Sequence, residues 1–253
     1  MAAPAATPPA IQVQSARLTY RGDVLFPDLT LEVAAGAWTC LLGPSGVGKT
    51  SLLRHVAGLT GSKASGTVEA SDGAPLPGRI AYMAQQDLLL PWLSALDNVA
   101  LGARLRTGQP SAADLTRARA LLAEVGLADA AQSRPGALSG GMRQRVALAR
   151  TLFENRPIVL MDEPFSAVDA ITRLMLQDMA ARLLAGRTVL MVTHDPMEAL
   201  RLGHRVLVMA GRPARIAAEI LPPGAPPRAM TDPRLLPLQS ELLRALEAAR
   251  LAA

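Results

Sequence analysis

Three short apolar runs stand out along the chain, and each is followed by residues of a different character. The runs cover residues 38–42, 158–161 and 188–192, and they lead into a glycine-rich stretch, two acids, and Thr-His-Asp, respectively. A continuous apolar run of this length is typical of a strand buried on both faces of a parallel sheet. The carboxyl ends of such strands are where ligands bind. The pattern therefore predicts an α/β fold with a parallel sheet and a ligand site at one of its edges.

Helical periodicity occurs between and after these runs. Residues 51–57 predict a helix that a glycine ends, and residues 139–153 predict a helix that begins at a serine N-cap. After a proline-rich connector, residues 238–251 predict a last helix. A further amphipathic helix is indicated by the apolar positions Leu115, Leu121, Leu122 and Val125.

Composition narrows the class of protein. Half of the residues are apolar, which suffices for a full core, and no apolar run approaches the roughly 20 residues of a membrane helix. The formal charge is +5, but the basic residues are scattered, so nucleic acid is not an expected partner. Cys40, the single cysteine, is expected to be a buried small side chain. Lys49 and Lys63 are the only lysines, so Lys49 marks a position that requires a compact ammonium group.

That lysine belongs to the sequence GPSGVGKT at residues 43–50, which matches the phosphate-binding pattern G-x-x-x-x-G-K-T. The stretch lies between a predicted strand and a predicted helix, as the pattern requires. Glycines let backbone N–H groups point at a phosphate, and the helix N-terminus adds partial positive charge. Lys49 is expected to reach the β and γ phosphates, the Thr50 hydroxyl to ligate Mg²⁺, and Ser51 to touch an inner phosphate.

Two further strand ends carry candidate catalytic groups. Asp162 and Glu163 follow the second apolar run, and because side chains alternate along a strand they can take different roles. Asp162 suits Mg²⁺, and Glu163 suits a general base for the attacking water. The alternative is that one of them caps the next helix. His194 follows the third run and is expected near the γ-phosphate, whereas His55 and His204 are expected to be structural.

A second glycine-rich helix start decides between the classes of phosphate-binding protein. The sequence LSGGMRQR at residues 138–145 resembles the signature motif of the ATP-binding subunits of ABC transporters, and the resemblance extends over roughly residues 11–215. It implies a P-loop NTPase with a RecA-like core, an antiparallel β-subdomain and an inserted α-helical subdomain. It also implies two copies paired head-to-tail, so that the signature of one closes over ATP held by the other.

The resemblance assigns roles to positions of this chain. Tyr20 matches the aromatic residue that stacks on adenine, and Asp169 matches the loop at the dimer interface, with Val168 where leucine is commoner. Glu163, His194 and Gln85 match the catalytic positions, with Thr50, Gln85 and Asp162 at the metal. The nucleotide-binding loop comprises Gly43, Pro44, Ser45, Gly46, Val47, Gly48, Lys49, Thr50 and Ser51. The signature residues acting in trans are Leu138, Ser139, Gly140, Gly141, Met142, Arg143 and Gln144.

The segment QQDLLLPW at residues 85–92 joins two amides and an acid to an apolar half. Gln85 is the expected glutamine of the active site, because relatives place Pro-Trp six and seven residues beyond it, although Gln86 is an alternative. Leu90, Pro91 and Trp92 are expected to contact a membrane permease, where an exposed apolar patch would serve docking. Alternatively, the leucines of this segment pack under the helical subdomain. For Leu88 and Leu89 the two possibilities have equal weight.

The resemblance also divides the chain. Residues 1–10 form an expected disordered tail, 11–85 and 155–220 the ATPase core with its β-subdomain, 86–154 the helical subdomain, and 221–253 a connector and helix. The expected protein is an ATPase bound to separate permease subunits at the cytoplasmic face of the cell membrane, working with a solute-binding protein. The segment 85–92 resembles importers of nitrate, sulfonates such as taurine, or thiamine and its pyrimidine precursor, with a slight lean to the pyrimidine branch. An ABC-type ATPase of an assembly machinery, such as iron–sulfur assembly, is the alternative.

Overall fold

The computed structural model describes residues 8–20, 22–60 and 64–252, and the chain divides into two compact units. The first unit comprises residues 1–80, 157–162 and 185–253. The second comprises residues 81–156 and 163–184. Each is described by itself.

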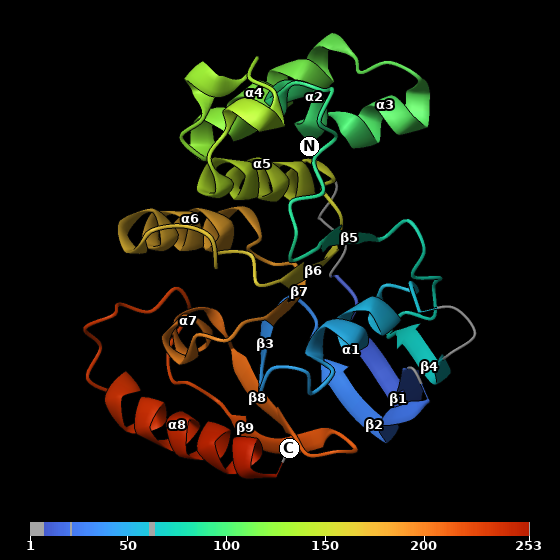
Figure 1. The fold of residues 1–253 in the computed structure, drawn as a ribbon, viewed down its shortest axis with the longest axis vertical. Helices are drawn as coiled ribbons and strands as arrows, with labels where there is room; N and C mark the ends of the chain where they lie inside the picture. The colour runs from blue at the N-terminus through green and yellow to red at the C-terminus, as the bar shows by residue number, and fades with distance from the viewer. Residues whose placement is uncertain (1–7, 21, 61–63, 253) are drawn as a thin grey trace. The chain divides into compact units, whose positions relative to one another are not determined.

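The first unit contains an antiparallel sheet with the strand order β2-β1-β4 (Figure 1). Its strands are β1 (Ile11–Tyr20), β2 (Asp23–Val33) and β4 (Ala64–Ala70). In β2 the residues toward its end alternate between buried and exposed, as expected for a sheet with one face on the core. The predicted antiparallel β-subdomain is confirmed.

The main sheet of the first unit has β3 at its centre, with β7 and β6 on one side and β8 and β9 on the other. The strands β6, β7, β3 and β8 run parallel, and β9 runs antiparallel to β8. Their bounds are β3 (Trp38–Leu42), β6 (Ile158–Asp162), β7 (Thr188–Val192), β8 (Arg205–Ala210) and β9 (Arg215–Ile220). Every residue of β3, β6 and β7 is buried, which confirms the strands predicted from the apolar runs. Strand β5 (Ile80–Met83) begins at the last residue of the first unit.

Three helices pack on this sheet (Figure 1). Helix α1 (Lys49–Val56) contacts β6 and β7, and α7 (Pro196–Leu202) contacts β3. Helix α8 (Leu235–Leu251) packs against α7, β8 and β9. It begins three residues before the predicted start, because Pro237 lies in its first turn, where a missing N–H costs nothing.

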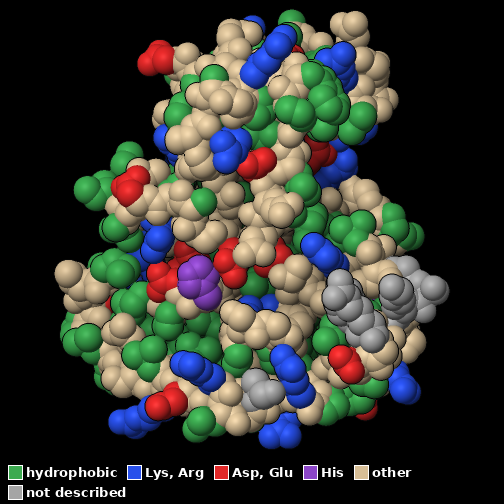
Figure 2. All heavy atoms as spheres, viewed as in Figure 1, with side chains coloured by type: hydrophobic (Ala, Val, Ile, Leu, Met, Phe, Trp, Pro, Cys, Tyr) green, Lys and Arg blue, Asp and Glu red, His purple; other side chains and the backbone are tan. Residues whose placement is uncertain are grey.

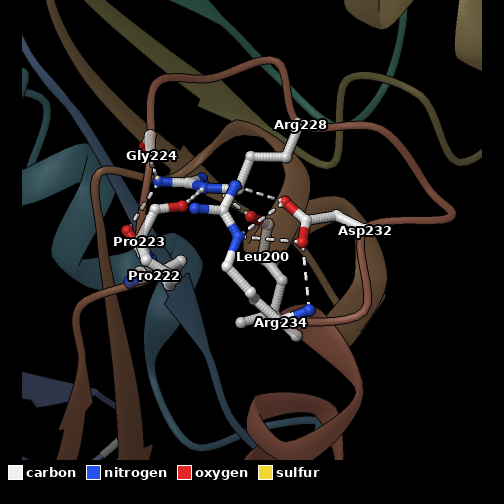
Figure 3. A network of polar contacts seen from close by, with 7 residues as sticks. All are labelled: Leu200, Pro222, Pro223, Gly224, Arg228, Asp232 and Arg234. Carbon is white, nitrogen blue, oxygen red and sulfur yellow. Dashed lines mark hydrogen bonds and ion pairs between the residues drawn. The ribbon is translucent and has the colours of Figure 1, made fainter.

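The connector that leads to α8 is fixed by one buried arginine, Arg228 (Figure 3). Its guanidinium group points into a ring of backbone carbonyl groups at the end of α7 and in the connector itself. Nε donates to Pro223 O at 2.8 Å, and the two other nitrogens donate to the carbonyl oxygens of Leu200, Gly203, Pro222 and Gly224 at 2.7–2.8 Å. The proline-rich segment is therefore a packed part of the first unit.

The second unit is mainly helical, with α2 and α4 packed on α5. Its helices are α2 (Ala95–Val99), α3 (Leu101–Thr107), α4 (Ala112–Glu124), α5 (Gly140–Phe153) and α6 (Ala170–Leu183), with 3₁₀ turns η2 (Ala128–Ala130) and η3 (Pro135–Ala137). Helix α5 begins after the N-cap Ser139 and ends at Phe153, as predicted. Leu122 of α4 is fully buried, whereas Leu115 and Leu121 are half-buried.

Two features differ from the expected boundaries. Residues 1–7 of the expected tail lie outside the described residues, but Pro9 O accepts a hydrogen bond from Thr188 Oγ1 at 2.7 Å, and Ala10 is buried. The packed chain therefore begins before Ile11. Residues 163–184, expected in the core, cluster with the helical second unit.

Charged side chains of both signs are spread over one face of the molecule (Figure 2). Lys and Arg side chains are dispersed over the face in Figure 2, with Asp and Glu between them. Within residues 8–252, leaving aside the undescribed gaps, no helix is long and apolar enough to cross a membrane.

Candidate functional site

The phosphate-binding loop lies between β3 and α1, as the sequence predicted. Lys49 is the first residue of α1 and is 8% exposed. Its Nζ donates to the carbonyl oxygens of Gly43 at 2.7 Å and Pro44 at 2.9 Å. The ammonium group is thus held over the loop by the loop's own backbone, and a short movement of a flexible stem brings it to a bound phosphate.

Two glycines of the loop are required by its shape. A Cβ on Gly43 would lie 2.3 Å from the carbonyl oxygen of Met209, so any side chain there would displace β8. Gly48 is the N-cap of α1 and has a φ of 111°, a conformation that favours glycine. Without a side chain, Gly48 cannot cap the helix, so the amide groups of the first turn are suited to an anion.

The strand register brings the predicted groups to one sheet edge. Leu41 of β3 is level with Val192 of β7, and Val192 is level with Asp162 of β6. The phosphate-binding loop starts two residues beyond Leu41, and His194 lies two residues beyond Val192. The start of the loop, Asp162 and His194 therefore share the carboxyl edge of the parallel sheet, as expected.

Asp162 and Glu163 have different environments. Asp162 ends β6 and is 1% exposed. Glu163 is half-buried and has a φ of 51°, a left-handed conformation that is uncommon and costly for a residue with a side chain. Such strained residues are concentrated at functional sites. The next helix, α6, is capped by Asp169, so neither Asp162 nor Glu163 has the capping role that the sequence left open.

The second unit holds Glu163 at several points. Gln85 Nε2 lies 3.4 Å from Glu163 Oε2, a long hydrogen bond that joins the expected glutamine to the expected base. Gln144 Nε2 donates to the carbonyl oxygens of Glu163 and Pro164 at 3.4 and 3.3 Å, and Ser166 Oγ donates to Glu163 O at 3.0 Å. The backbone of Glu163 is therefore tied to α5, the helix of the signature sequence.

The signature sequence forms the start of α5. Ser139 is exposed, and its Oγ accepts a hydrogen bond from the backbone N–H of Met142 at 3.2 Å. A Cβ on Gly141 would lie 3.1 Å from Ala167 O, so the loop before α6 approaches α5 where only glycine fits easily. Asp169 caps α6 by accepting from Thr172 N at 3.0 Å, and this hydrogen bond is the main reason that its pKa lies below the usual range.

The loop 85–92 is clamped to α5 by two arginines whose roles the sequence did not reveal. Arg143 Nε donates to Asp87 Oδ2 at 2.9 Å, in an ion pair. Arg150 donates to the carbonyl oxygens of Asp87 at 2.6 Å and Leu88 at 2.9 Å. Arg143 belongs to the signature motif, and Arg150 lies two turns further along the same helix. Helix α5 therefore contacts both Glu163, the expected base, and the loop 85–92 that contains Gln85.

The apolar half of this loop is shaped by Asn98, which is fully buried. Asn98 Oδ1 accepts from Leu90 N at 2.8 Å, and Nδ2 donates to the carbonyl oxygens of Leu90, Leu93 and Ser94 at 3.0–3.3 Å. Leu89 is 8% exposed, but Leu88 and Trp92 are 58% and 65% exposed. Leu89 therefore packs in the core, whereas Leu88 and Trp92 lie on the surface of the described structure.

The remaining residues singled out from the sequence are two histidines, the cysteine and the expected adenine-stacking tyrosine. His55 Nδ1 contacts Thr60 Oγ1 at 3.2 Å, and His204 Nδ1 accepts from Trp38 N at 3.0 Å, so both are structural, with pKa values lowered by burial. Cys40 is fully buried, and burial raises the pKa of its thiol. Tyr20 ends β1, where it pairs with Asp23, but its side chain lies outside the described part of the structure.

The oxygen ligands that the chain offers suit an Mg²⁺ ion whose remaining ligands come from a nucleotide and water. Among the described residues, no group of three or more His, Cys, Asp or Glu side chains could hold a metal ion. Mg²⁺ commonly takes only one or two protein oxygens together with phosphates and water. Thr50 at the start of α1 and Asp162 at the end of β6 offer a hydroxyl and a carboxylate of the kind it uses.

A phosphate loop, a carboxylate after a buried parallel strand and a second glycine-rich helix start define a nucleotide-binding domain of the P-loop class. The model of the ABC transporter family matches residues 26–166. The chain belongs to this family, in which it is an ATP-binding subunit and an ATPase.

Relatives cover nearly the whole chain. An uncharacterized ABC transporter ATP-binding protein of Haemophilus influenzae is 43% identical, over 93% of this chain and 98% of the relative. An aliphatic sulfonates import ATP-binding protein of Burkholderia lata, SsuB 2, is 46% identical, over 94% of this chain and 87% of the relative. A solved dimeric, post-hydrolysis state of an ATP-binding cassette with ADP and phosphate is 29% identical, with a TM-score of 0.75, covering 85% of this chain and 99% of that one.

Proposed function

We propose that this chain is the ATP-hydrolysing subunit of an importer of aliphatic sulfonates, and that it drives uptake through separate permease subunits. The observation that carries the proposal is the identity of 41–46% with subunits named for aliphatic sulfonate import, over at least 90% of this chain. These names favour the sulfonate branch over the pyrimidine-precursor branch. They also favour an importer over an ATPase of an assembly machinery.

In this proposal the loop from Gly43 to Ser51 holds the triphosphate. Backbone N–H groups at the start of α1 donate to its oxygens, and Lys49 leaves the loop carbonyls to reach the β and γ phosphates. Tyr20 stacks on the adenine ring. Thr50, Gln85 and Asp162 are the residues that would hold Mg²⁺ with bound ATP, and the ion would neutralise charge that develops on the phosphates.

Hydrolysis requires an activated water molecule beside the γ-phosphate. Glu163 is the proposed general base, with its backbone fixed by Gln144 and its carboxylate beside Gln85. Gln85 orients the same water, and its contact with Glu163 favours it over Gln86. His194, exposed at the end of β7, stabilises the γ-phosphate.

The proposed active unit is a head-to-tail homodimer, in line with the dimeric relative of known structure. Ser139 is exposed at the N-terminus of α5, a helix end suited to the γ-phosphate of the other copy. Gly141 lets the backbone approach closely, and the loop that ends at Asp169 lies across the dimer interface.

The proposed permease contact is the apolar end of the loop 85–92, formed by the half-buried Leu90 and the exposed Pro91 and Trp92. Trp92 is 65% exposed, and a large exposed aromatic side chain is a frequent anchor at interfaces. The subunit would lie at the cytoplasmic face of the cell membrane, held there by the permease, and a solute-binding protein would deliver the sulfonate.

Growth on a sole sulfur source tests the function. A strain that lacks this gene should fail to grow on an aliphatic sulfonate such as taurine but should grow normally on sulfate. The wild-type gene should restore growth, and the Glu163→Gln variant, expressed at the same level, should not. Normal growth of the deletion strain on every aliphatic sulfonate tried would contradict the proposed substrate class. Uptake of radiolabelled solutes would then identify the correct one.

A further inference from the structure

A cavity of about 590 Å³ lies beside the phosphate-binding loop, in the first unit. Three segments line it: residues 23–25 at the start of β2, Gly46 and Val47 of the loop, and residues 211–213 in the turn between β8 and β9. The cavity therefore extends from the phosphate-binding loop to the start of β2.

The turn between β8 and β9 is fixed in this position. Strands β8 and β9 pair up to Ala210 and Arg215, which leaves a four-residue turn from residue 211 to 214. Ala214 N donates to Leu25 O at 2.7 Å, so the turn is tied to the opposite wall of the cavity. Arg212 at its tip is thereby held close to the loop, and a Cβ on Gly46 would lie 3.7 Å from Arg212 Nη2.

The walls of the cavity have the chemistry of a nucleoside site. Val24, Leu25 and Val47 offer apolar surface to a flat ring, and Asp23 and Arg212 offer one charge of each sign. Within the described part of the chain, the side chains of Asp23 and Arg212 have no hydrogen-bond or ion-pair partner. In the same hairpin, by contrast, the side chain of Arg205 is paired with Glu219.

We propose that Arg212 is a nucleotide-positioning residue that donates hydrogen bonds to the ribose of ATP, while Asp23 accepts from a ribose hydroxyl. The inference rests on the proposed phosphate site, because phosphates held by the loop at Lys49 place the sugar beside Gly46 and Val47. A guanidinium group has several donors in a fixed plane, which suits the adjacent oxygens of a sugar. The contact is remote from the γ-phosphate, so it contributes to binding equally before and after hydrolysis.

The test compares Arg212→Gln with Arg215→Gln, a matched control in the same hairpin whose side chain does not line the cavity. Arg212→Gln should weaken ATP and ADP binding about 10-fold, the size of one hydrogen bond to a charged group, and should raise KM with kcat unchanged. Arg215→Gln should change neither by more than about 2-fold. Inorganic tripolyphosphate, which lacks the sugar, should inhibit wild type and Arg212→Gln with the same constant.

Two results would overturn the inference. One is unchanged ATP and ADP affinity in Arg212→Gln. The other is an equal loss of affinity for tripolyphosphate, which would make Arg212 a general attraction for phosphate. Lys49→Ala separates this inference from the site on which it rests. If Lys49→Ala binds ATP normally, the phosphate site itself is wrong, whereas loss of binding in Lys49→Ala with no effect of Arg212→Gln rejects only the role of Arg212.

Discussion

Replacing Arg228 by alanine should destabilise the first unit strongly. The side chain is 4% exposed, and all five N–H donors of the guanidinium group are engaged with backbone carbonyl oxygens. Three of these carbonyl groups belong to the connector before α8, and two belong to the end of α7 and the residue after it. One residue therefore joins the end of α7 to the connector through hydrogen bonds.

The expected size follows from opposing contributions. A hydrogen bond to a charged group is worth about 1.5–3 kcal/mol, but five on one group are not additive, and burying the charge costs several kcal/mol. The pKa of Arg228 is lowered mainly by that burial. Alanine removes the donors and leaves buried acceptors behind, so the free energy of unfolding should fall by about 3–5 kcal/mol. Lysine at this position retains the charge but has three donors, so it should restore only part of the loss.

Urea unfolding with two probes measures this loss. Circular dichroism reports the helices, and the reactivity of Cys40 towards a thiol reagent reports the first unit, because Cys40 is fully buried in β3. Both midpoints should shift to lower urea in Arg228→Ala. Arg234→Ala is the control, since this neighbouring arginine is exposed and pairs only with Asp232 among the described residues, and its midpoint should not move measurably. A loss of less than 1 kcal/mol in Arg228→Ala would refute the reasoning.

Further outcomes follow from the site. Glu163→Gln should lower kcat about 10²- to 10⁴-fold, the usual contribution of a general base, with ATP binding retained, and unchanged turnover would remove Glu163 from this role. Lys49→Ala should abolish measurable ATP binding in equilibrium titrations, because it removes the ammonium group held over the loop. A double-mutant cycle on Asp87→Asn and Arg143→Gln should give a coupling of about 0.5–1 kcal/mol in unfolding, since both side chains are partly exposed, and additivity would mean that the ion pair contributes nothing. Cys40 should resist alkylation in the native protein even at pH 9, because burial raises the pKa of its thiol, and labelling at the rate of a free thiol would contradict that burial.

The placement of single side chains in the loop 85–92 shows where sequence patterns stop being informative. Leu88 and Leu89 are adjacent and identical in type, yet Leu88 is exposed with a φ of 47° and Leu89 is buried. The difference arises because Arg150 and Asn98 bind the backbone on either side, at Leu88 O and Leu90 N. These partners are 62 and 8 residues away, and no local periodicity reports them.

Polar residues that are buried are a second case. Arg228 lies in a proline-rich connector and Asn98 in a short helix. Both are residue types that are usually exposed, yet each is buried. Their burial is possible because each meets a set of backbone groups that secondary structure leaves unpaired. For Asn98 these groups lie within eight residues, whereas Arg228 also binds carbonyl groups 25 and 28 residues away, which only tertiary packing brings near.

The sequence by itself determined the buried parallel strands, the phosphate-binding loop and the N-terminus of α5. Each is encoded locally, since a fully buried strand needs consecutive apolar residues, and a backbone that cradles phosphate needs glycines at fixed spacing. Tertiary structure alone decided the contacts of Glu163, the attachment of the loop 85–92 to α5, and the position of Arg212 beside Gly46. These depend on hydrogen bonds and close approaches between residues far apart in the chain, whose geometry is set by the packing of whole elements.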